Sequence, residues 1–433
     1  MRISAVLHKI WVYCLVAICQ LSGYACAYGA AAVAPQSQLA IKLPAGFQIN
    51  IFSQLTEKLS GESQAQPRMM AFDSQGRLFV ALSDTNKVVM LPDANKDGLA
   101  EAPIIIASNL NAPNSIAFID DNTLLIANQD GVIKLVKDGS TWSTPKAFIS
   151  NLPSDGHTLK TVKIGPDGFL YVNVGSSCNV CVESEPLRAT ILRYTLQGKP
   201  AGSLVTLSKH AASPIWARGL RNSQGFAWQS KTGAMFATNE GADNRSYIKN
   251  GEADDDIPPE HLNQIMAGRN YGWPHCWGNL YTDRVEENEI KSNPHRWGML
   301  FQDPNFIGPA NFCENATPPA ITFDSHSTPI GITFLDKTNF PAEYKNDAIV
   351  ALHGSWNRKN PSGYKLVRVK FNAEKPVQVV DFATGWLNIN STVQNQVQAQ
   401  AWGRPVDVIA GPDGALYVSD DRAALIYRIS YKQ

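Results

Sequence analysis

Short apolar strand patterns recur along most of this chain, and each is followed by a tight turn and a second strand pattern. The clearest unit runs from Gly156 to Val174, in which Gly165-Pro-Asp-Gly168 supplies a hairpin turn and Phe169–Val174 is rich in strand formers. Nearly the same pattern returns at Gly411–Val418 and, in a looser form, at Phe72–Val80. Self-similarity on this scale is typical of repeat architectures.

Six such units follow one another. Their first strands begin at or near these residues: Pro67, Pro113, His157, Leu220, Ile330 and Arg404. The spacing of the first two units suits a four-stranded propeller blade, and the later units carry insertions. Phe47–Phe52 reads as a strand without a hairpin partner of its own, so we expect it to complete the last blade and remove an exposed edge. The sequence therefore predicts an all-β, six-bladed β-propeller; an open array of β-sandwich units is the structural alternative.

The longest departure from the repeat lies between Ala242 and Thr328. It contains three tryptophans, the acidic run Asp254-Asp255-Asp256 and two cysteines. A loop of this length in a compact domain usually has a function. We predict a long inserted loop region between blades 4 and 5 that covers one mouth of the central channel.

The N-terminus has the pattern of an export signal. A basic start precedes an apolar run from Ile10 to about Leu21, and Ala25-Cys26-Ala27 supplies small residues for cleavage. The run is short for a membrane span. We expect a signal peptide over residues 1–27, a propeller domain over residues 28–433 and a periplasmic or secreted protein. A lipid or uncleaved anchor is the alternative. Cys19 and Cys26 raise the possibility of a lipid anchor, but neither follows a convincing lipobox.

The cysteine count also favours an exported protein. Beyond residue 27, four of the 7 cysteines remain, and an even number in an exported chain favours disulfides. We predict two bonds, Cys178 to Cys181 and Cys276 to Cys313. A c-type haem would need histidine where Val182 stands, and zinc would need two further ligands near the first pair.

Net charge adds one exclusion. The 38 basic side chains balance 38 acidic ones, so nothing favours nucleic acid or an anionic membrane as a partner.

Candidate chemistry gathers at the residues that lead into each inner strand, because a propeller brings these positions together around its axis at one face. They are Arg68, Asn114, His157, Arg221 with Asn222, a Thr328-Pro329 segment and Arg404. Three arginines and a histidine in one place call for an anion or for carbonyl groups as acceptors. The set indicates a planar, anionic ligand. The alternative is structural: the arginines bridge blades through backbone carbonyls, and His157 is a hydrogen-bonded structural histidine.

Two segments resemble calcium sites. Asp93-Ala-Asn-Lys-Asp-Gly98 begins like a calcium loop, but Ile104 stands where the bidentate glutamate belongs, so a hairpin turn is the other interpretation. In the inserted region, Asp255 and Asp256, with Asp254 and Glu260, either hold calcium or form a solvated acidic loop.

Several motifs together resemble the glucose/sorbosone dehydrogenase family, soluble quinoproteins that use pyrroloquinoline quinone on a six-bladed propeller. The resemblance covers nearly the whole mature chain in the right order. The matching stretches are Gly156-His157 with Gly165–Gly168, Gly219-Leu-Arg-Asn-Ser-Gln-Gly225, Pro258–Asn263 with Asn270-Tyr-Gly-Trp-Pro274, and His353-Gly-Ser-Trp-Asn-Arg358.

The resemblance implies a role for each matching residue. His157 matches the general base that takes the substrate hydroxyl proton while hydride passes to the quinone. Arg221 matches the arginine that polarises the quinone oxygens. Asn222, Gln224 and Arg404 match groups that contact the cofactor, and Arg404 would bind the carboxylates of the cofactor. Arg68 joins this cofactor-binding set because of its axial position. The calcium of the family is held partly by main-chain carbonyls, here around Gly241 and Ala242.

The sequence also departs from the glucose enzymes. Ser176 or Ser177 stands where they have an acidic residue that orients the base. In place of their cofactor-binding lysine, the chain offers His353, Arg358 or Lys365. The calcium segment is stretched by an insertion before Pro258. These differences fit the sorbosone-type branch better than the glucose branch.

The sequence thus predicts a soluble quinoprotein that oxidises an aldose, a sorbosone-like aldehyde or a related sugar with pyrroloquinoline quinone and Ca2+. Because the chain has no haem motif, its electrons would leave through a separate cytochrome or quinone. A lactonase-type hydrolase is an alternative, although it would need carboxylates rather than arginines around the axis. A non-enzymatic propeller that binds a glycan or a partner through the tryptophan-bearing insertion is the other.

Overall fold

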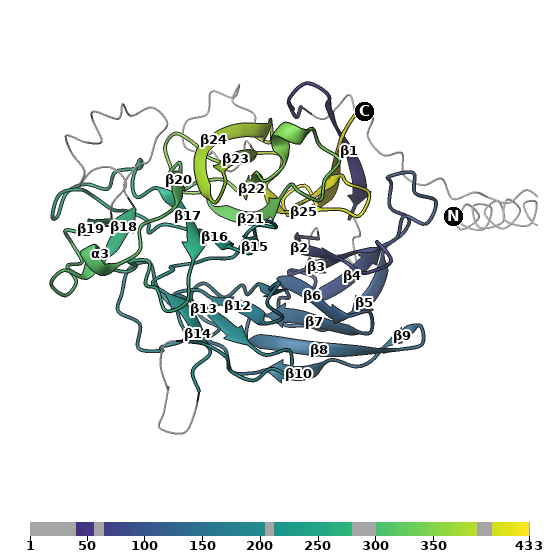
Figure 1. Ribbon diagram of the computed structural model, residues 1–433, viewed down its shortest axis with the longest axis horizontal. Coiled ribbons are helices and arrows are strands. Elements are labelled where there is room, and N and C mark those ends of the chain that lie inside the picture. Colours follow the sequence, from purple (N-terminus) through teal and green to yellow (C-terminus); the bar gives the residue numbers. More distant parts are fainter. Residues whose placement is uncertain (1–39, 56–64, 204–211, 279–299, 388–400, 433) are drawn as a thin grey trace, which may run out of the picture. The chain divides into compact units, whose positions relative to one another are not determined.

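The computed structural model describes residues 40–55, 65–203, 212–278, 300–387 and 401–432, and these residues form a six-bladed β-propeller (Figure 1). Six antiparallel sheets make the blades, five with four strands and one with a fifth, short strand beside its four. The helical elements of the described residues are short, namely α3 (Phe312–Asn315) and a 3-10 turn at Ala342–Tyr344. The predicted fold class is confirmed, whereas the predicted signal peptide lies outside the described residues.

The first three blades follow the chain from the inner strand outward. Blade 1 consists of β2 (Pro67–Phe72), β3 (Leu78–Leu82), β4 (Lys87–Leu91) and β5 (Ile104–Ala107). Blade 2 consists of β6 (Ser115–Asp120), β7 (Thr123–Asn128), β8 (Gly131–Asp138) and β10 (Lys146–Ile149), with the short β9 (Thr141–Trp142) beside β8. Blade 3 consists of β11 (Val162–Ile164), β12 (Leu170–Val174), β13 (Thr190–Tyr194) and β14 (Ile215–Arg218).

The last three blades repeat the arrangement. Blade 4 consists of β15 (Phe226–Trp228), β16 (Met235–Asn239), β17 (Glu260–Ile265) and β20 (Ile321–Phe323). Blade 5 consists of β21 (Pro329–Phe334), β22 (Ala348–Leu352), β23 (Lys365–Asn372) and β24 (Lys375–Thr384). Blade 6 consists of β25 (Pro405–Ala410), β26 (Leu416–Asp420), β27 (Leu425–Tyr431) and, from the other end of the chain, β1 (Phe47–Gln54).

Closure of the ring by the N-terminal strand is confirmed. β1 pairs antiparallel with β27, and its Ile49 and Ile51 lie opposite Ile429 and Tyr427. Both isoleucines are buried in the core between blades 5 and 6. Burial of an isoleucine side chain stabilises a fold by roughly 1.5–3 kcal/mol. The pairing therefore ties the two ends of the domain together and leaves β27 without an open edge.

The recurring turn has the same hydrogen bonds in two blades. In blade 3 the N–H of Gly168, which has φ +77°, donates to the carbonyl of Gly165, and the Tyr171 hydroxyl donates to Asp167 Oδ2 at 2.8 Å. In blade 6 the Tyr417 hydroxyl donates to Asp413 Oδ2 at 3.2 Å. The Gly-Pro-Asp-Gly repeat thus has a structural role, which is to form the turn of a blade. Its last residue is glycine because glycine adopts a positive φ readily.

The position of the inserted region differs from the prediction. β17 and β20 both lie inside the segment between Ala242 and Thr328 and complete blade 4, so the extra residues lie within that blade and not between blades 4 and 5. One extra segment joins β16 to β17. The other joins β17 to β20 and carries α3 and the hairpin of β18 (Cys276–Gly278) and β19 (Leu300–Gln302). The prediction was wrong because Glu260, His261 and Asn263 make β17 read as polar, although all three are buried.

Both predicted disulfides are present, between Cys178 and Cys181 and between Cys276 and Cys313. Among the described residues, no helix is long and apolar enough to span a membrane.

Candidate active site

The residues that lead into the inner strands meet at one face of the ring. Arg68, at the start of β2, donates through Nε to Asn114 Oδ1 and through Nη2 to Gln224 Oε1, both at 3.0 Å. Asn114 in turn donates to the Lys160 carbonyl and the Thr161 hydroxyl in blade 3. These bonds join blades 1, 2, 3 and 4, so the structure does bring this part of the predicted axial set together.

His157 is held through its Nδ1 side. Nδ1 lies 3.1 Å from the Ser176 carbonyl oxygen and 3.0 Å from its hydroxyl oxygen. The Ser176 hydroxyl donates to the Cys178 carbonyl at 2.7 Å, so it is an acceptor toward the ring. Nδ1 therefore carries the proton. Within the described residues Nε2 has no hydrogen-bond partner, which leaves it as the basic nitrogen.

Electrostatics favour the neutral form of this ring. Burial lowers the pKa of His157, and the positive charge of Arg221 lowers it further, against opposing contributions from Glu240 and Asp243. A neutral imidazole with a free Nε2 is the state that accepts a proton near neutral pH.

Arg221 precedes β15, and its side chain is bound from two sides. Nε donates to the Asn179 carbonyl at 3.2 Å, while Nη2 donates to Asn179 Oδ1 and to Asp243 Oδ2, each at 3.1 Å. Asp243 also accepts from Asn357 at 2.8 Å and lies 3.3 Å from His326 Nδ1. Burial opposes the ionisation of Asp243, but the hydrogen bond from His326 and the charge of Arg221 outweigh it and lower the pKa of that carboxyl.

Asn222 and Gln224 share one acceptor. Their amide nitrogens donate to the two oxygens of Glu240, each at 3.0 Å. Asn222 Oδ1 is buried and has no hydrogen-bond partner among the described residues. An unpaired buried acceptor is costly, so this oxygen is available to a donor or cation that enters the site.

A second group of cations lies at the start of blade 6. Arg404 donates to the carbonyls of His353 and Gly354, at 3.2 Å and 2.7 Å. Burial and the neighbouring charges of Arg68 and Arg422 lower the pKa of Arg404. Asp421 contacts Arg68 and His353, and Asp420 accepts the main-chain N–H groups of Arg404 and Arg422. The three arginines outnumber these two carboxyl groups, and the excess of positive charge suits a ligand that carries carboxylates.

Arg358 lies apart from that group. Its guanidinium forms an ion pair with Asp256 and donates to the Ser325 carbonyl at 3.1 Å. The N–H of Lys359 donates to Asp255 at 2.8 Å. Asp255 and Asp256 thus hold the loop after β22, and the structure does not place them in one cluster with Glu260.

Glu260 lies instead beside the predicted carbonyl ligands of calcium. Its Oε2 accepts the N–H of Gly241 at 2.5 Å, and it is 3% exposed. Burial raises the pKa of Glu260 to about 8, with a further contribution from Glu240. A cavity of about 20 Å³ borders Arg221, Glu240, Gly241 and Ala242, which is enough volume for one water molecule or ion.

Sequence reasoning missed four residues that shape this site: Asn179, Glu240, Asp243 and Asp421. Glu240 follows β16 and Asp421 follows β26 directly, as Ser176 and His353 follow β12 and β22 closely. Because β-strands in a blade are antiparallel, the end of the second strand lies beside the start of the first. The positions just after the second strand of each blade therefore indicate residues of the site, as the positions before the first strand do.

Comparison with known proteins adds a family and a fold. Residues 50–432 match the model of a family described as TrAA12-like. Among curated proteins, the chain is 25% identical to an uncharacterized protein of Borreliella burgdorferi over 91% of each. It is 24% identical to a pyrroloquinoline quinone-dependent pyranose dehydrogenase of Coprinopsis cinerea, over 92% of this chain and 55% of that protein, so it spans about half of that relative.

Two solved structures share the fold over nearly their whole length. The Trichoderma reesei enzyme of Carbohydrate-Active Enzymes family AA12 superposes with a TM-score of 0.73 and 20% identity, covering 93% of this chain and 100% of that one. The holo form of the PQQ domain of Coprinopsis cinerea pyranose dehydrogenase gives a TM-score of 0.72 at 21% identity, covering 92% and 98%.

Proposed function

This chain belongs to the TrAA12-like family, and from this premise we propose that it is a sugar dehydrogenase that depends on pyrroloquinoline quinone. Its relatives include sugar oxidoreductases of this kind. The observation that carries the proposal is the pairing of His157, neutral and free at Nε2, with the buried Arg221 in one site.

The donor set fits a planar tricarboxylate. Arg404 and its neighbour Arg422 would face carboxylates, and Arg221 would face the quinone oxygens. Asn222 Oδ1 and the amide of Gln224 would contact the same ligand. When bound, pyrroloquinoline quinone supplies a hydride acceptor. The role of His157 would be that of a general base. Its Nε2 would accept the proton of the substrate hydroxyl, while Ser176 holds the Nδ1–H as the imidazolium forms.

Arg68 has a different balance of roles. Each of its donor nitrogens already has an acceptor in another blade, at Asn114, Gln224 or Asp421. Its contribution is then chiefly to hold Gln224 and Asp421 in place. His353 and Arg358 are two of the predicted substitutes for a cofactor-binding lysine. His353 contacts Asp421 and so lies with Arg68 and Arg404, whereas Arg358 pairs with Asp256.

Calcium would bind beside Gly241 and Ala242. Main-chain carbonyls there, with Glu240 or Glu260, offer the oxygen ligands that Ca2+ requires, and the small cavity gives it space. The ion would offset the charge of Glu240 and favour the ionised form of Glu260, whose pKa burial and Glu240 raise to about 8.

The substrate we propose is an aldose, a sorbosone-like aldehyde or a related sugar, with a separate cytochrome or quinone as electron acceptor. The two disulfides support a periplasmic or secreted location.

The test is titration of the metal-free apo-protein with pyrroloquinoline quinone and calcium, followed by quinone absorbance. Wild type and the control Arg77→Ala, which changes an ion pair with Asp73 outside the site, should bind alike. Arg221→Ala should lose about 100-fold or more in affinity, because the quinone oxygens would lose a charged hydrogen-bond donor. His157→Gln should bind the quinone but lose turnover with sugars by roughly 10²–10⁴-fold. Absence of binding in both wild type and Arg77→Ala would overturn the proposal.

A further inference from the structure

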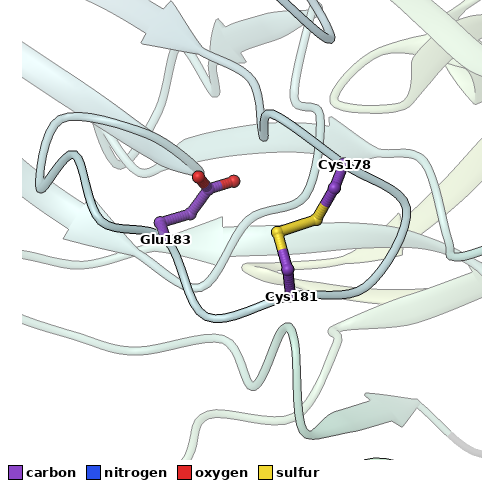
Figure 2. Close-up of side chains that lie close together, drawn as sticks. All are labelled: Cys178, Cys181 and Glu183. Atoms are coloured by element: carbon purple, nitrogen blue, oxygen red, sulfur yellow. A yellow bond between two sulfur atoms is a disulfide. The ribbon is translucent and has the colours of Figure 1, made fainter.

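A disulfide-closed loop adjoins the site, and we refer to its residues Ser176–Glu183 as the clip loop. It follows β12. Figure 2 shows the disulfide between Cys178 and Cys181 and, on the same loop, the side chain of Glu183. The Ser177 N–H and hydroxyl donate to the two carboxylate oxygens of Glu183, at 2.7 Å and 2.8 Å. Both cysteines are half-buried, so a small reagent has access to the bond between them.

The first end of the clip loop holds the base. Ser176 accepts the His157 Nδ1–H, and its own hydroxyl donates to the carbonyl of Cys178 at 2.7 Å. The orientation of that hydroxyl therefore depends on where the Cys178 carbonyl points. In addition, the Ser176 carbonyl accepts the main-chain N–H of His157 at 2.9 Å.

The middle of the clip loop holds the arginine. Asn179 lies between the two cysteines, and its carbonyl accepts from Arg221 Nε at 3.2 Å and from Trp273 Nε1 at 3.0 Å. Its side-chain oxygen accepts from Arg221 Nη2 and from the Asp243 N–H, while its amide donates to the Asp243 carbonyl at 2.8 Å. Asn179 is thus the shared contact of Arg221 and of the segment that carries Asp243.

We propose that the clip loop is the positioning element for both His157 and Arg221, and that the Cys178–Cys181 bond makes their geometry sensitive to reduction. The inference rests on the proposed function for its catalytic meaning. The disulfide closes a ring that contains only Asn179 and Val180 between its ends, which restricts the backbone that presents the Asn179 carbonyl. Opening the ring frees that backbone, so both catalytic groups lose their fixed partner at once.

Reduction is a balanced two-electron step. A dithiol reductant donates two electrons and two protons, the Cys178–Cys181 bond breaks, two thiols form, and the reductant closes into its own cyclic disulfide. Removal of the reductant and addition of an oxidant should restore the bond and the activity.

The experiment compares oxidised wild type, wild type treated with dithiothreitol, and Cys178→Ser/Cys181→Ser. Cys276→Ser/Cys313→Ser isolates the clip, because it lacks the other disulfide. The first readout is the imidazole ring signals of His157 in ¹⁵N-labelled apo-protein, assigned with His157→Gln; it requires neither cofactor nor turnover. The second is kcat and KM of the holoenzyme with a sugar substrate.

We expect reduction to shift the His157 ring signals and to lower kcat at least tenfold, with KM changed less than threefold. Cys178→Ser/Cys181→Ser should show the same state before any treatment and no further response to dithiothreitol, whereas Cys276→Ser/Cys313→Ser should respond like wild type. Asn179→Ala, which keeps the disulfide, should weaken quinone binding at least tenfold and leave the His157 signals in place.

Unchanged His157 signals and a kcat within twofold after verified reduction of Cys178–Cys181 would overturn the inference. Failure of the proposed function is distinguishable, since it appears as absent quinone binding in oxidised wild type. The His157 signals still decide the positioning role in that case.

Discussion

Arg68 Nη1 donates to Asp421 Oδ2 at 2.8 Å, and this ion pair links the first blade to the end of β26 in the sixth. The two side chains are 6% and 12% exposed. His353 donates to the same carboxylate at 2.9 Å. Burial opposes ionisation of Asp421, but the His353 hydrogen bond and the Arg68 charge outweigh it and hold the pKa of that carboxyl well below its usual range. A buried pair at the seam of the ring makes Asp421 important for stability as well as for the site.

Removal of Asp421 should destabilise the domain strongly. Asp421→Ala leaves Arg68 buried without its ionic partner, so we expect a loss of about 3–5 kcal/mol in the free energy of unfolding, measured by urea denaturation at pH 7. The matched control is Asp381→Ala, which breaks the more exposed pair with Lys365 and should cost less than about 1 kcal/mol. Equal losses in the two variants would contradict the structural role of the Arg68–Asp421 pair.

Stability should fall in mild acid because of His261. Its Nε2 accepts the Gly278 N–H at 2.9 Å inside blade 4, and burial lowers the pKa of His261 to about 4. The unfolded state takes up a proton near pH 6.5 while the folded state stays neutral, so the stability contributed by this difference is lost as pH falls from about 6.5 to 4. The loss amounts to roughly 3 kcal/mol.

The variant His261→Gln isolates this residue. A glutamine amide oxygen is able to accept the Gly278 N–H but takes up no proton. We expect urea denaturation at pH 7.5 and pH 5 to show a smaller stability difference between the two pH values in His261→Gln than in wild type. The same difference in both proteins would assign the acid sensitivity to other groups.

Binding of the proposed calcium ion should release a proton from Glu260. At pH 7 a carboxyl with a pKa of about 8 is mostly protonated, and a cation bound beside Gly241 would favour its ionised form. Isothermal titration in buffers of different ionisation enthalpy should show close to one proton released in wild type and none in Glu260→Gln, which should also bind calcium about tenfold more weakly. Asp255→Asn and Asp256→Asn, whose carboxylates contact residues 358–359, should behave as wild type. If either of these reproduces Glu260→Gln, the ion binds in the acidic run instead.

The fold could be predicted from the sequence wherever the local pattern and the buried pattern agree. The Gly165–Gly168 turn, the alternation of its strand and the lone strand at Phe47–Phe52 all reflect short-range chemistry or a simple edge argument. β17 could not be found, because Glu260 and His261 are buried through contacts with Gly241 and Gly278 in other segments. The polar residues of β17 therefore reflect buried contacts at the site and do not indicate exposure to solvent.

The site was predictable on one side only. His157, Arg221 and Arg404 precede inner strands, and the repeat itself marks those positions. The acceptors of Arg221, which are Asn179 and Asp243, come from loops whose path depends on a disulfide and on the insertion in blade 4. No periodicity in the sequence fixes such loops, although the positions after β16 and β26 would have pointed to Glu240 and Asp421.

Ser176→Ala tests how His157, the base in the proposed function, is held. The variant removes the hydroxyl that accepts the His157 Nδ1–H at 3.0 Å and retains the Ser176 carbonyl at 3.1 Å as the remaining acceptor. One neutral hydrogen bond is worth about 1 kcal/mol, so kcat should fall on the order of tenfold or less. Loss of an acceptor disfavours the imidazolium, and the acid limb of the kcat/KM profile should move to lower pH. Ser177→Ala is the matched control, because Ser177 donates to Glu183 and does not contact the ring. A profile for Ser176→Ala that matches that of Ser177→Ala would mean that the carbonyl alone positions His157.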